Sequence, residues 1–457
     1  EYSQYNTKLK DYNPFDMLKS YDFFDSEIMF GIDSFDIVIM NPPYFQLTGK
    51  HKYLHYFEKG KNKTADIYQL FMETALNKLL SQMGVVSAVV SNKWMRAGYG
   101  ERTREFLYNN CYVFEIIDLG ANWFESATVD TNIITYAKDR EKQEKIEAYK
   151  ISKCENIELN KNEKNNFIFT SKDYGAWIIL NKTEKDILEK VKKFKPLKNW
   201  NIQINYGIKT GFNEAFIIDE ETKNKLILED KKSKEIIKPL LRGRDIKRYS
   251  YDFKNLYLIN THNGIKEKNI LPIDINKYSA IKKYLDKYYS DLEVRQDKGI
   301  TPYNLRNCAY LEDFEKSKIV WTPVNGIYYF SFVDAGYYFN NSVFMITNKN
   351  NDISELKYLL AVLNTATFKF GSLITPLTKV GHYTYGSKEF METIPIPNID
   401  TKNKKLVDKI INNVSEILKF KGENSSADVS EIEKEIDNLV YELYNLSNEE
   451  IRLIEGK

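Results

Sequence analysis

The chain contains a short apolar segment that ends abruptly at two consecutive prolines. The segment Phe35–Met40 reads Phe-Asp-Ile-Val-Ile-Met and is followed by Asn41-Pro42-Pro43-Tyr44. Its β-branched and apolar residues predict a buried strand. Proline has no backbone N–H to donate, so the strand has to stop there and the chain has to turn. The sequence therefore places a rigid polar loop directly at the carboxyl end of a strand.

Strands and helices alternate in the first 140 residues. The further strands that we expect are Val85–Ser91, Phe114–Leu119 and Asn132–Ala137, and the expected helices are Asp66–Met83 and Glu101–Asn110. This alternation is typical of an α/β domain with a largely parallel sheet, whose last strand we expect to be antiparallel at the sheet edge. Ligands of such open sheets bind beyond the carboxyl ends of the strands, where the polar loop lies.

Beyond residue 140 the composition changes, and we predict two further parts. A Lys- and Glu-rich connection leads into a mixed α/β region with expected strands at Glu214–Asp219, Lys318–Thr322 and Ser342–Thr347 and expected helices at Ser279–Tyr288 and Ser354–Asn364. Residues 400–457 carry two apolar stripes at helical spacing, separated by the loop Gly422–Asp428, and are expected to form a helical hairpin. The predicted domains are therefore 1–140, 141–399 and 400–457.

The composition argues against several classes of protein. No apolar run approaches the about 20 residues that a bilayer span requires. The three cysteines are far apart and odd in number, which favours a reducing cytoplasm over a disulfide framework or a zinc site, and we expect no metal. The formal net charge is only +2. Any surface that binds nucleic acid therefore has to come from local clusters of cations.

The polar loop has the chemistry needed to activate an aromatic amine. The exocyclic amine of adenine is a poor nucleophile because its lone pair is delocalised into the ring. Two acceptors on its hydrogens, the Asn41 side-chain oxygen and the Pro42 carbonyl, would draw the nitrogen towards tetrahedral geometry. Pro42 and Pro43 fix the backbone, and Tyr44 is placed to stack on the base, which has to flip out of a duplex. For the tetrapeptide alone, the alternative is a simple turn.

The loop and its neighbours resemble the gamma-class, TaqI-like N6-adenine DNA methyltransferases, and especially single-chain type IIG restriction-modification enzymes. The further segments that carry the resemblance are Met83–Asn92 and Trp123–Thr135, and the likeness covers nearly the whole chain. It implies methyl transfer from S-adenosylmethionine to a flipped adenine. The catalytic residues that it implies are Asn41, Pro42, Pro43, Tyr44 and Phe124, with Phe124 facing Tyr44 across the base.

Another short segment, Asn13-Pro14-Phe15-Asp16, resembles the acidic motif that holds the cofactor's adenine in this family. The resemblance makes Phe15 and Asp16 the expected cofactor contacts. The family's glycine-containing first motif and the acidic residue that holds the ribose are missing, which implies an N-terminally truncated Rossmann-like sheet and an upstream cofactor-binding segment. Type IIG enzymes also carry a nuclease motif upstream. We therefore expect S-adenosylmethionine to be the cofactor of the complete enzyme and this fragment alone to be inactive.

The second part of the chain resembles the target-recognition domain of the same enzymes. Its characteristic stretches are Asn205–Phe216 and Leu240–Tyr249, and the latter places four cations within seven positions. Such a cluster can contact several phosphates or present an arginine fork to a guanine edge. The expected DNA-binding residues are Lys209, Arg242, Arg244, Lys247 and Arg248. For each of them, the alternative is a solvated surface charge.

The sequence leaves two other functions open. One is a DNA-binding specificity module with an inactive catalytic remnant, which a glycine motif upstream in the complete gene would argue against. The other is methyl transfer to a protein amide or to an RNA adenine, because Asn-Pro-Pro-Tyr also serves such enzymes. The long second part with its basic turns favours double-stranded DNA as the partner. We expect the protein to be cytoplasmic and to have no membrane segment.

Overall fold

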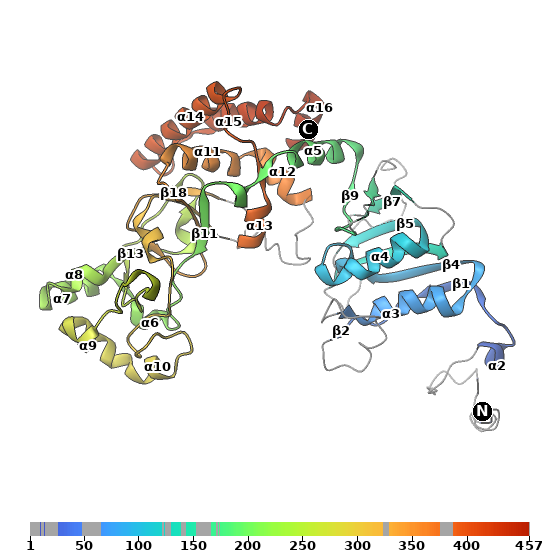
Figure 1. Cartoon of the computed structure of the whole chain (residues 1–457), viewed down its shortest axis with the longest axis horizontal. Helices are drawn as coiled ribbons and strands as arrows, with labels where there is room; N and C mark the ends of the chain where they lie inside the picture. The colour runs from blue at the N-terminus through green and yellow to red at the C-terminus, as the bar shows by residue number, and fades with distance from the viewer. Residues whose placement is uncertain are drawn as a thin grey trace. The chain divides into compact units, whose positions relative to one another are not determined.

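The computed structural model describes residues 10, 13, 26–47, 65–120, 123, 129–138, 143–151, 166–170, 172, 174–322, 329–374 and 387–456 (Figure 1). The chain divides into two compact units, which are Glu1–Lys182 with Lys379–Gly381 and Thr183–Thr378 with His382–Lys457. Among the described residues, the N-terminal unit has one hydrophobic core and the C-terminal unit has two. In the same residues, no helix combines the length and the apolar character that crossing a membrane requires.

The N-terminal unit is built on one mixed sheet of seven strands. In order across the sheet, these are β1 (Phe35–Met40), β4 (Leu80–Ser91), β6 (Thr131–Lys138), β5 (Cys111–Gly120), β7 (Lys145–Lys150), β8 (Phe167–Phe169) and β9 (Ile179–Leu180). β1 and β4 run parallel, as do β5 and β7, whereas β6 is antiparallel to both of its neighbours. The helices of this unit include α2 (Ser26–Phe30), which precedes β1, and α3 (Ile67–Thr74) and α4 (Glu101–Asn110), which lie between strands. The predicted α/β class is confirmed, but the expectation of a largely parallel sheet is wrong, because β8 is antiparallel to β7 and to β9 and β6 is antiparallel to both of its neighbours.

The position of β6 differs from the prediction. We expected an antiparallel strand at the sheet edge. Its antiparallel orientation is confirmed, but its place at the edge is wrong, because β6 lies between β4 and β5 and pairs with both. β6 follows β5 in the sequence and pairs with it antiparallel, so one edge of β6 is taken up by β5. The other edge of β6 pairs with β4. Ile134 and Tyr136 of β6 are fully buried, as suits an interior strand. The sheet also continues past the predicted domain boundary at residue 140, because β7, β8 and β9 extend it.

The helix that follows the polar loop is shorter than predicted. α3 covers Ile67–Thr74 and continues as a π-helical turn over Ala75–Leu79, and β4 already begins at Leu80. The residues that α3 and this turn bury against the sheet are Tyr68, Met72, Ala75 and Leu76. The hydroxyl of Tyr136 donates to the Met72 carbonyl at 2.9 Å, which ties the helix to β6. This packing fixes the start of α3 beside the loop.

The C-terminal unit contains two four-stranded sheets. One has the order β11 (Ile202–Tyr206), β20 (Phe344–Asn348), β17 (Lys318–Trp321) and β18 (Ser331–Val333), and the other has the order β12 (Ile217–Asp219), β16 (Leu256–Ile259), β13 (Ile237–Leu241) and β19 (Tyr338–Phe339). The short strand pairs are β14 (Ile246–Lys247) with β15 (Ser250–Tyr251) and β10 (Lys195–Pro196) with β21 (Pro395–Ile396). The strand predicted over Glu214–Asp219 begins instead as the helical turn α6 (Asn213–Phe216).

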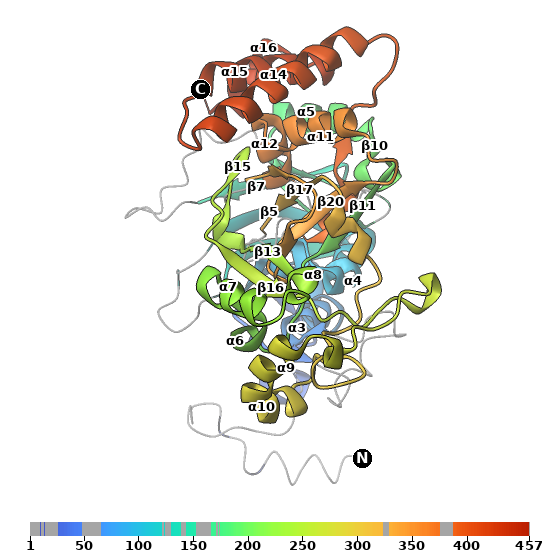
Figure 2. The same cartoon turned by 90° about the vertical axis from the view of Figure 1, so that its left-hand side faces the viewer.

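The helices of this unit pack around both sheets. The helices that precede the C-terminal segment are α5 (Lys182–Lys192), α7 (Glu220–Glu229), α8 (Ser233–Ile236), α9 (Ser279–Leu285), α10 (Tyr289–Val294), α11 (Ile353–Leu363), α12 (Ala366–Ile374) and α13 (Lys388–Thr393). The predicted hairpin consists of α14 (Lys404–Glu423) and α15 (Ser430–Leu443), which lie side by side, with α16 (Asn448–Ile454) after them (Figure 2). Its apolar stripes join one core with α11 and the first sheet. The hairpin is thus part of the C-terminal unit.

One strand of this unit, β17, carries a buried lysine. Lys318 on β17 has no exposed surface, and its ammonium group donates to the carbonyl oxygens of Phe314 at 2.9 Å, Asp334 at 3.2 Å and Tyr337 at 3.4 Å. Loss of hydration disfavours its charged form and lowers the pKa of Lys318 to about 7. The protonation of one side chain is therefore linked to folding.

This linkage predicts a pH dependence of stability. Between pH of about 7 and the ordinary lysine pKa of 10.5, the unfolded chain holds the Lys318 proton and the folded unit does not. The free energy of unfolding should then rise with pH in this window, and the effect should vanish below about 7, where both states are protonated. Urea unfolding of wild type and Lys318→Met over a pH series measures it. Equal pH slopes in the two proteins would contradict the linkage.

Candidate functional site

The polar loop lies at the carboxyl end of β1, as the sequence predicted. Pro42 is buried, Tyr44 is half-buried, and Asn41 and Pro43 are exposed. Just beyond the loop, β2 (Gln46–Leu47) pairs antiparallel with β3 (Ala65–Asp66), directly before α3. This pairing fixes both ends of the loop, one on the sheet and one on the helix.

The side chains of Tyr44 and Asn41 meet within the loop. The Tyr44 hydroxyl lies 2.8 Å from the Asn41 Oδ1 atom and 2.9 Å from the Val89 carbonyl oxygen of β4, and it can donate its single proton to either. Burial raises the pKa of Tyr44, so the hydroxyl stays protonated at neutral pH. An amide oxygen has two lone pairs. Asn41 Oδ1 can therefore accept a second N–H while it remains held by Tyr44.

Polar side chains follow the neighbouring strands at the same edge of the sheet. Asn92, directly after β4, donates through its Nδ2 atom to Asp118 Oδ1 of β5 at 2.9 Å. The Asn92 Oδ1 atom is buried, and it has no hydrogen-bond partner among the described residues. Asp130, directly before β6, has a raised pKa because of burial and then because of Asp118. The sequence analysis did not predict Asn92, Asp118 or Asp130 as site residues. A polar residue at the end of an apolar strand is the pattern that could have indicated them.

The remaining site residues predicted for this unit are Phe124, Phe15 and Asp16, and they lie outside the described residues. The structure therefore brings together Asn41, Pro42, Pro43 and Tyr44 and does not place the expected second aromatic or the expected cofactor contacts. No group of three or more His, Cys, Asp or Glu suited to a metal occurs in the described parts of the chain.

In the C-terminal unit, most of the predicted DNA-binding cations are paired with carboxylates. Arg242 donates through Nε and Nη2 to the two oxygens of Asp245, at 2.9 Å each, and its backbone N–H donates to the same carboxylate at 2.9 Å. These bonds close the turn η7 (Gly243–Asp245) and raise the pKa of Arg242. Lys247 pairs with Asp252 at 2.6 Å, and Lys209 pairs with Asp297 at 2.9 Å.

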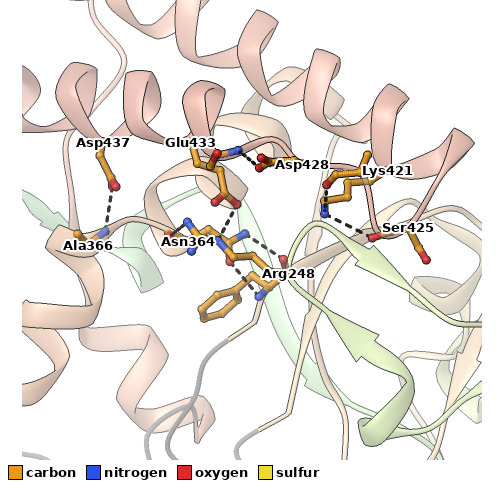
Figure 3. Close-up of polar contacts among 11 residues, drawn as sticks. Arg248, Asn364, Ala366, Lys421, Ser425, Asp428, Glu433 and Asp437 are labelled. Carbon is orange, nitrogen blue, oxygen red and sulfur yellow. Dashed lines mark hydrogen bonds and ion pairs between the residues drawn. The ribbon is translucent and has the colours of Figure 1, made fainter.

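Arg248 connects the basic stretch to the C-terminal helices (Figure 3). Its Nε atom lies 3.0 Å from Glu433 Oε1 of α15, and its Nη2 atom donates to the Asn364 carbonyl at 2.8 Å. Asn364 in turn exchanges two hydrogen bonds with the backbone of Phe330, at 2.9 and 3.1 Å. Burial raises the pKa of Glu433, which shows how far this carboxylate is withdrawn from water. Arg248 therefore holds segments of the unit together.

Arg244 differs from the other four cations. Its side chain is exposed at the tip of η7, and within the described residues no hydrogen bond or ion pair involves it. Gly243 lets this turn pack closely, because a Cβ atom there would lie 3.1 Å from Thr322 Oγ1 and 3.2 Å from Ser342 Oγ. The turn is thus a rigid support with one free guanidinium group.

The stretch Asn205–Phe216 is held mainly by backbone packing. A Cβ atom at Gly207 would lie 2.1 Å from the Asn340 carbonyl oxygen, so only glycine fits there. Gly211 has φ +71°, in the left-handed region that glycine favours. Beside it, the guanidinium of Arg295 donates to the carbonyl oxygens of Thr210, Asp297, Pro302 and Asn304. The characteristic residues of this stretch therefore maintain a loop conformation.

A hollow of about 610 Å³ lies beside β11 in the same unit. It is lined by five lysines and three carboxylates, which are Lys198, Lys268, Lys316, Lys349, Lys388, Glu312, Asp313 and Glu392. Three of the lysines pair with these carboxylates, whereas Lys198 and Lys349 have no ion pair within the described residues. These lysines come from distant parts of the sequence, so local clustering could not reveal them.

Comparisons with known proteins agree with this division of the chain. Residues 2–124 match the Eco57I restriction-modification methylase family, and residues 238–396 match the TaqI-like C-terminal specificity domain. The type II methyltransferase M.BstVI of Geobacillus stearothermophilus is 21% identical over 454 residues, which cover 92% of this chain and 75% of that protein. The type II restriction enzyme and methyltransferase RM.Eco57I of Escherichia coli is 24% identical over 432 residues, which cover 82% of this chain and 42% of that protein.

The solved structure of the type IIL restriction-modification enzyme MmeI in complex with DNA shares the fold. Its TM-score is 0.55 at 12% sequence identity, over 92% of this chain and 56% of that chain. The chain thus spans three quarters of the length of M.BstVI but less than half of RM.Eco57I. The chain therefore combines a segment similar to the Eco57I-type restriction-modification methylases with a TaqI-like C-terminal specificity domain.

Proposed function

We propose that this chain is the catalytic and DNA-recognising part of an enzyme that methylates N6 of adenine in a specific duplex sequence, within a restriction-modification system. The observation that carries the proposal is the Asn41–Tyr44 loop at the carboxyl end of β1, joined in one chain to a specificity domain. The relatives M.BstVI and RM.Eco57I are type II methyltransferases, and MmeI was solved in complex with DNA, which supports the same reaction class and partner.

The loop would act on an adenine that has left the duplex. Asn41 Oδ1 and the Pro42 carbonyl accept hydrogen bonds from the two N6 hydrogens, and the nitrogen lone pair becomes available as the amine pyramidalises. Tyr44 holds the base by stacking, and Phe124 is the proposed second face. S-adenosylmethionine supplies an electrophilic methyl group when bound, and Phe15 and Asp16 are the proposed contacts for it.

Two other functions receive less support. An inert catalytic remnant would not need an Asn41 side-chain oxygen that lies 2.8 Å from the Tyr44 hydroxyl, which itself lies 2.9 Å from the Val89 carbonyl of β4. If the substrate were a protein amide or RNA, the region that matches a TaqI-like specificity domain would have no evident function. We therefore propose duplex DNA as the substrate.

The proposed reaction can be tested on DNA from cells. The complete gene is expressed in a bacterial strain that lacks adenine methylation, and single-molecule sequencing then maps N6-methyladenine across the genome. We expect modification at one sequence motif, and an Asn41→Ala gene serves as the control. A genome without N6-methyladenine, or with modified cytosine alone, would refute the proposal.

The ion pairs narrow the choice of the cation in the basic stretch that contacts DNA. The sequence made all five cations equal candidates for phosphate contacts, whereas the carboxylates beside four of them leave Arg244 as the cation best placed to meet a phosphate. The loss of one contact between a cation and a phosphate makes the negative slope of log K against log salt shallower by about 0.9. We expect Arg244→Ala to produce a change of this size.

Fluorescence anisotropy with a labelled duplex of random sequence, titrated at several salt concentrations, measures this slope. Lys231→Ala is the matched control, because it removes one exposed positive charge from the same unit. We expect Arg248→Ala to lower the melting temperature, since it breaks the Glu433 pair, and to leave the slope unchanged. A slope that falls with Arg248→Ala and not with Arg244→Ala would reverse the assignment.

A further inference from the structure

A tight glycine turn lies close to the catalytic loop. The sequence Gly98-Tyr99-Gly100 forms the turn η4 directly before α4. At Gly100 a Cβ atom would lie 1.9 Å from the Trp94 carbonyl oxygen, so no residue with a side chain fits this position. The turn brings the Tyr99 hydroxyl to 3.1 Å from the Asp66 Oδ2 atom, to which it donates.

Tyr99 and Asp66 enclose the hydroxyl end of a buried tyrosine on α3. The Tyr68 side chain has no exposed surface, and its hydroxyl lies 3.4 Å from the Tyr99 hydroxyl. Gln69 adds a second tie, because its Nε2 atom donates to the Tyr99 carbonyl at 3.3 Å and its Oε1 atom accepts from the Asp66 backbone N–H at 2.8 Å. The Tyr68 hydroxyl and the residues next to it at the start of α3 are therefore held by the same turn.

The ring of Tyr68 meets the ring of Tyr44. The two ring centroids are 6.1 Å apart and the planes cross at 88°, which is the edge-to-face arrangement that aromatic pairs favour. The same Asp66 also pairs with Gln46, two residues beyond Tyr44, in the short β2–β3 ladder. The loop aromatic is thus fixed by its hydroxyl, by a neighbouring ring and by the backbone that follows it.

We propose that Tyr68, locked by Tyr99 and Asp66, is a positioning residue that sets the orientation of the Tyr44 ring for stacking on the flipped base. The inference rests on the proposed function. A stacking face contributes most when its rotamer is fixed before the base arrives, because no ordering is then needed in the transition state. A residue that merely fills the core would affect stability without affecting base retention.

The test compares Tyr68→Leu with Tyr68→Phe in the complete gene product with S-adenosylmethionine. Tyr68→Leu removes the ring and should lower turnover and weaken retention of the flipped base, each by roughly tenfold, within the range for loss of one base–aromatic stack. Tyr68→Phe keeps the ring but loses the hydroxyl contact with Tyr99, so its turnover and base retention should lie between those of wild type and Tyr68→Leu. A duplex with 2-aminopurine at the target adenine reports base flipping.

Tyr108→Leu is the matched control, because Tyr108 forms a similar edge-to-face pair with Tyr174 in the same unit, with centroids 5.8 Å apart. It should change stability alone. If Tyr68→Leu does not fold, Tyr99→Phe, which removes the bond to Asp66, is read in the same assays and should lower the flipping signal. A Tyr68→Leu or Tyr99→Phe enzyme with wild-type turnover and flipping would overturn the inference. Absence of adenine methylation by the wild type would instead refute the proposed function.

Discussion

Replacement of Asn41 by alanine in the complete enzyme should lower turnover by on the order of a hundredfold or more and leave DNA affinity nearly constant. The Asn41 oxygen is needed most as the amine pyramidalises, so its loss falls on the transition state. The Tyr44 hydroxyl already holds this oxygen at 2.8 Å, and little reorganisation is needed when the base arrives. Single-turnover methylation and equilibrium binding separate the two quantities.

Tyr44 provides the comparison for this experiment. Tyr44→Ala removes a stacking face worth about 1–3 kcal/mol and should weaken retention of the extrahelical base. Tyr44→Phe keeps the ring, loses the one hydroxyl proton that can bind either Asn41 or Val89, and should be mild. The fluorescence of 2-aminopurine at the target should still rise in Asn41→Ala, because flipping does not need that side chain. Intact turnover in Asn41→Ala, or equal damage by both Tyr44 variants, would contradict the assigned roles.

The second large effect is expected for Arg295 in the C-terminal unit. Its side chain is 7% exposed, its guanidinium donates to four backbone carbonyls, and its charge lies 4.5 Å from the centre of the Phe216 ring. Burial lowers the pKa of Arg295 to about 10, which still leaves it charged at neutral pH. Arg295→Met should destabilise the unit by about 3–5 kcal/mol, because the buried carbonyls lose their donors.

Urea unfolding followed by tryptophan fluorescence measures this loss, and Trp200 and Trp321 both lie in the C-terminal unit. Arg306→Met is the control, because Arg306 is half-exposed and pairs only with Asp297, at 3.1 Å, among the described residues. This pair should contribute less than about 1 kcal/mol. Equal losses for the two variants would show that the four carbonyl contacts do not stabilise the unit.

Local sequence patterns were sufficient to predict several helices and strands and the place of the polar loop Asn41–Tyr44. The strand Phe35–Met40 and the helix Glu101–Asn110 have the predicted bounds. The spacing of apolar residues, proline and glycine each determine the backbone conformation of only a few neighbouring residues, so these elements can be predicted locally. The helical hairpin followed from two apolar stripes for the same reason. The loop Asn41–Tyr44 at the carboxyl end of β1 could be predicted because both its strand and its prolines are adjacent to it in the sequence.

The pairing of the strands and the pairing of the charged side chains depend on contacts between residues that are distant in the sequence. The place of β6 between β4 and β5 depends on long-range hydrogen bonds that no local pattern encodes. Arg248 and Lys209 meet their carboxylates, Glu433 and Asp297, across long stretches of sequence, so a basic cluster in the chain became a set of ion pairs in the fold. The contacts from Tyr44 to Tyr68 and from Asp66 to Tyr99 likewise exist only because packing brings α3 and η4 to the polar loop.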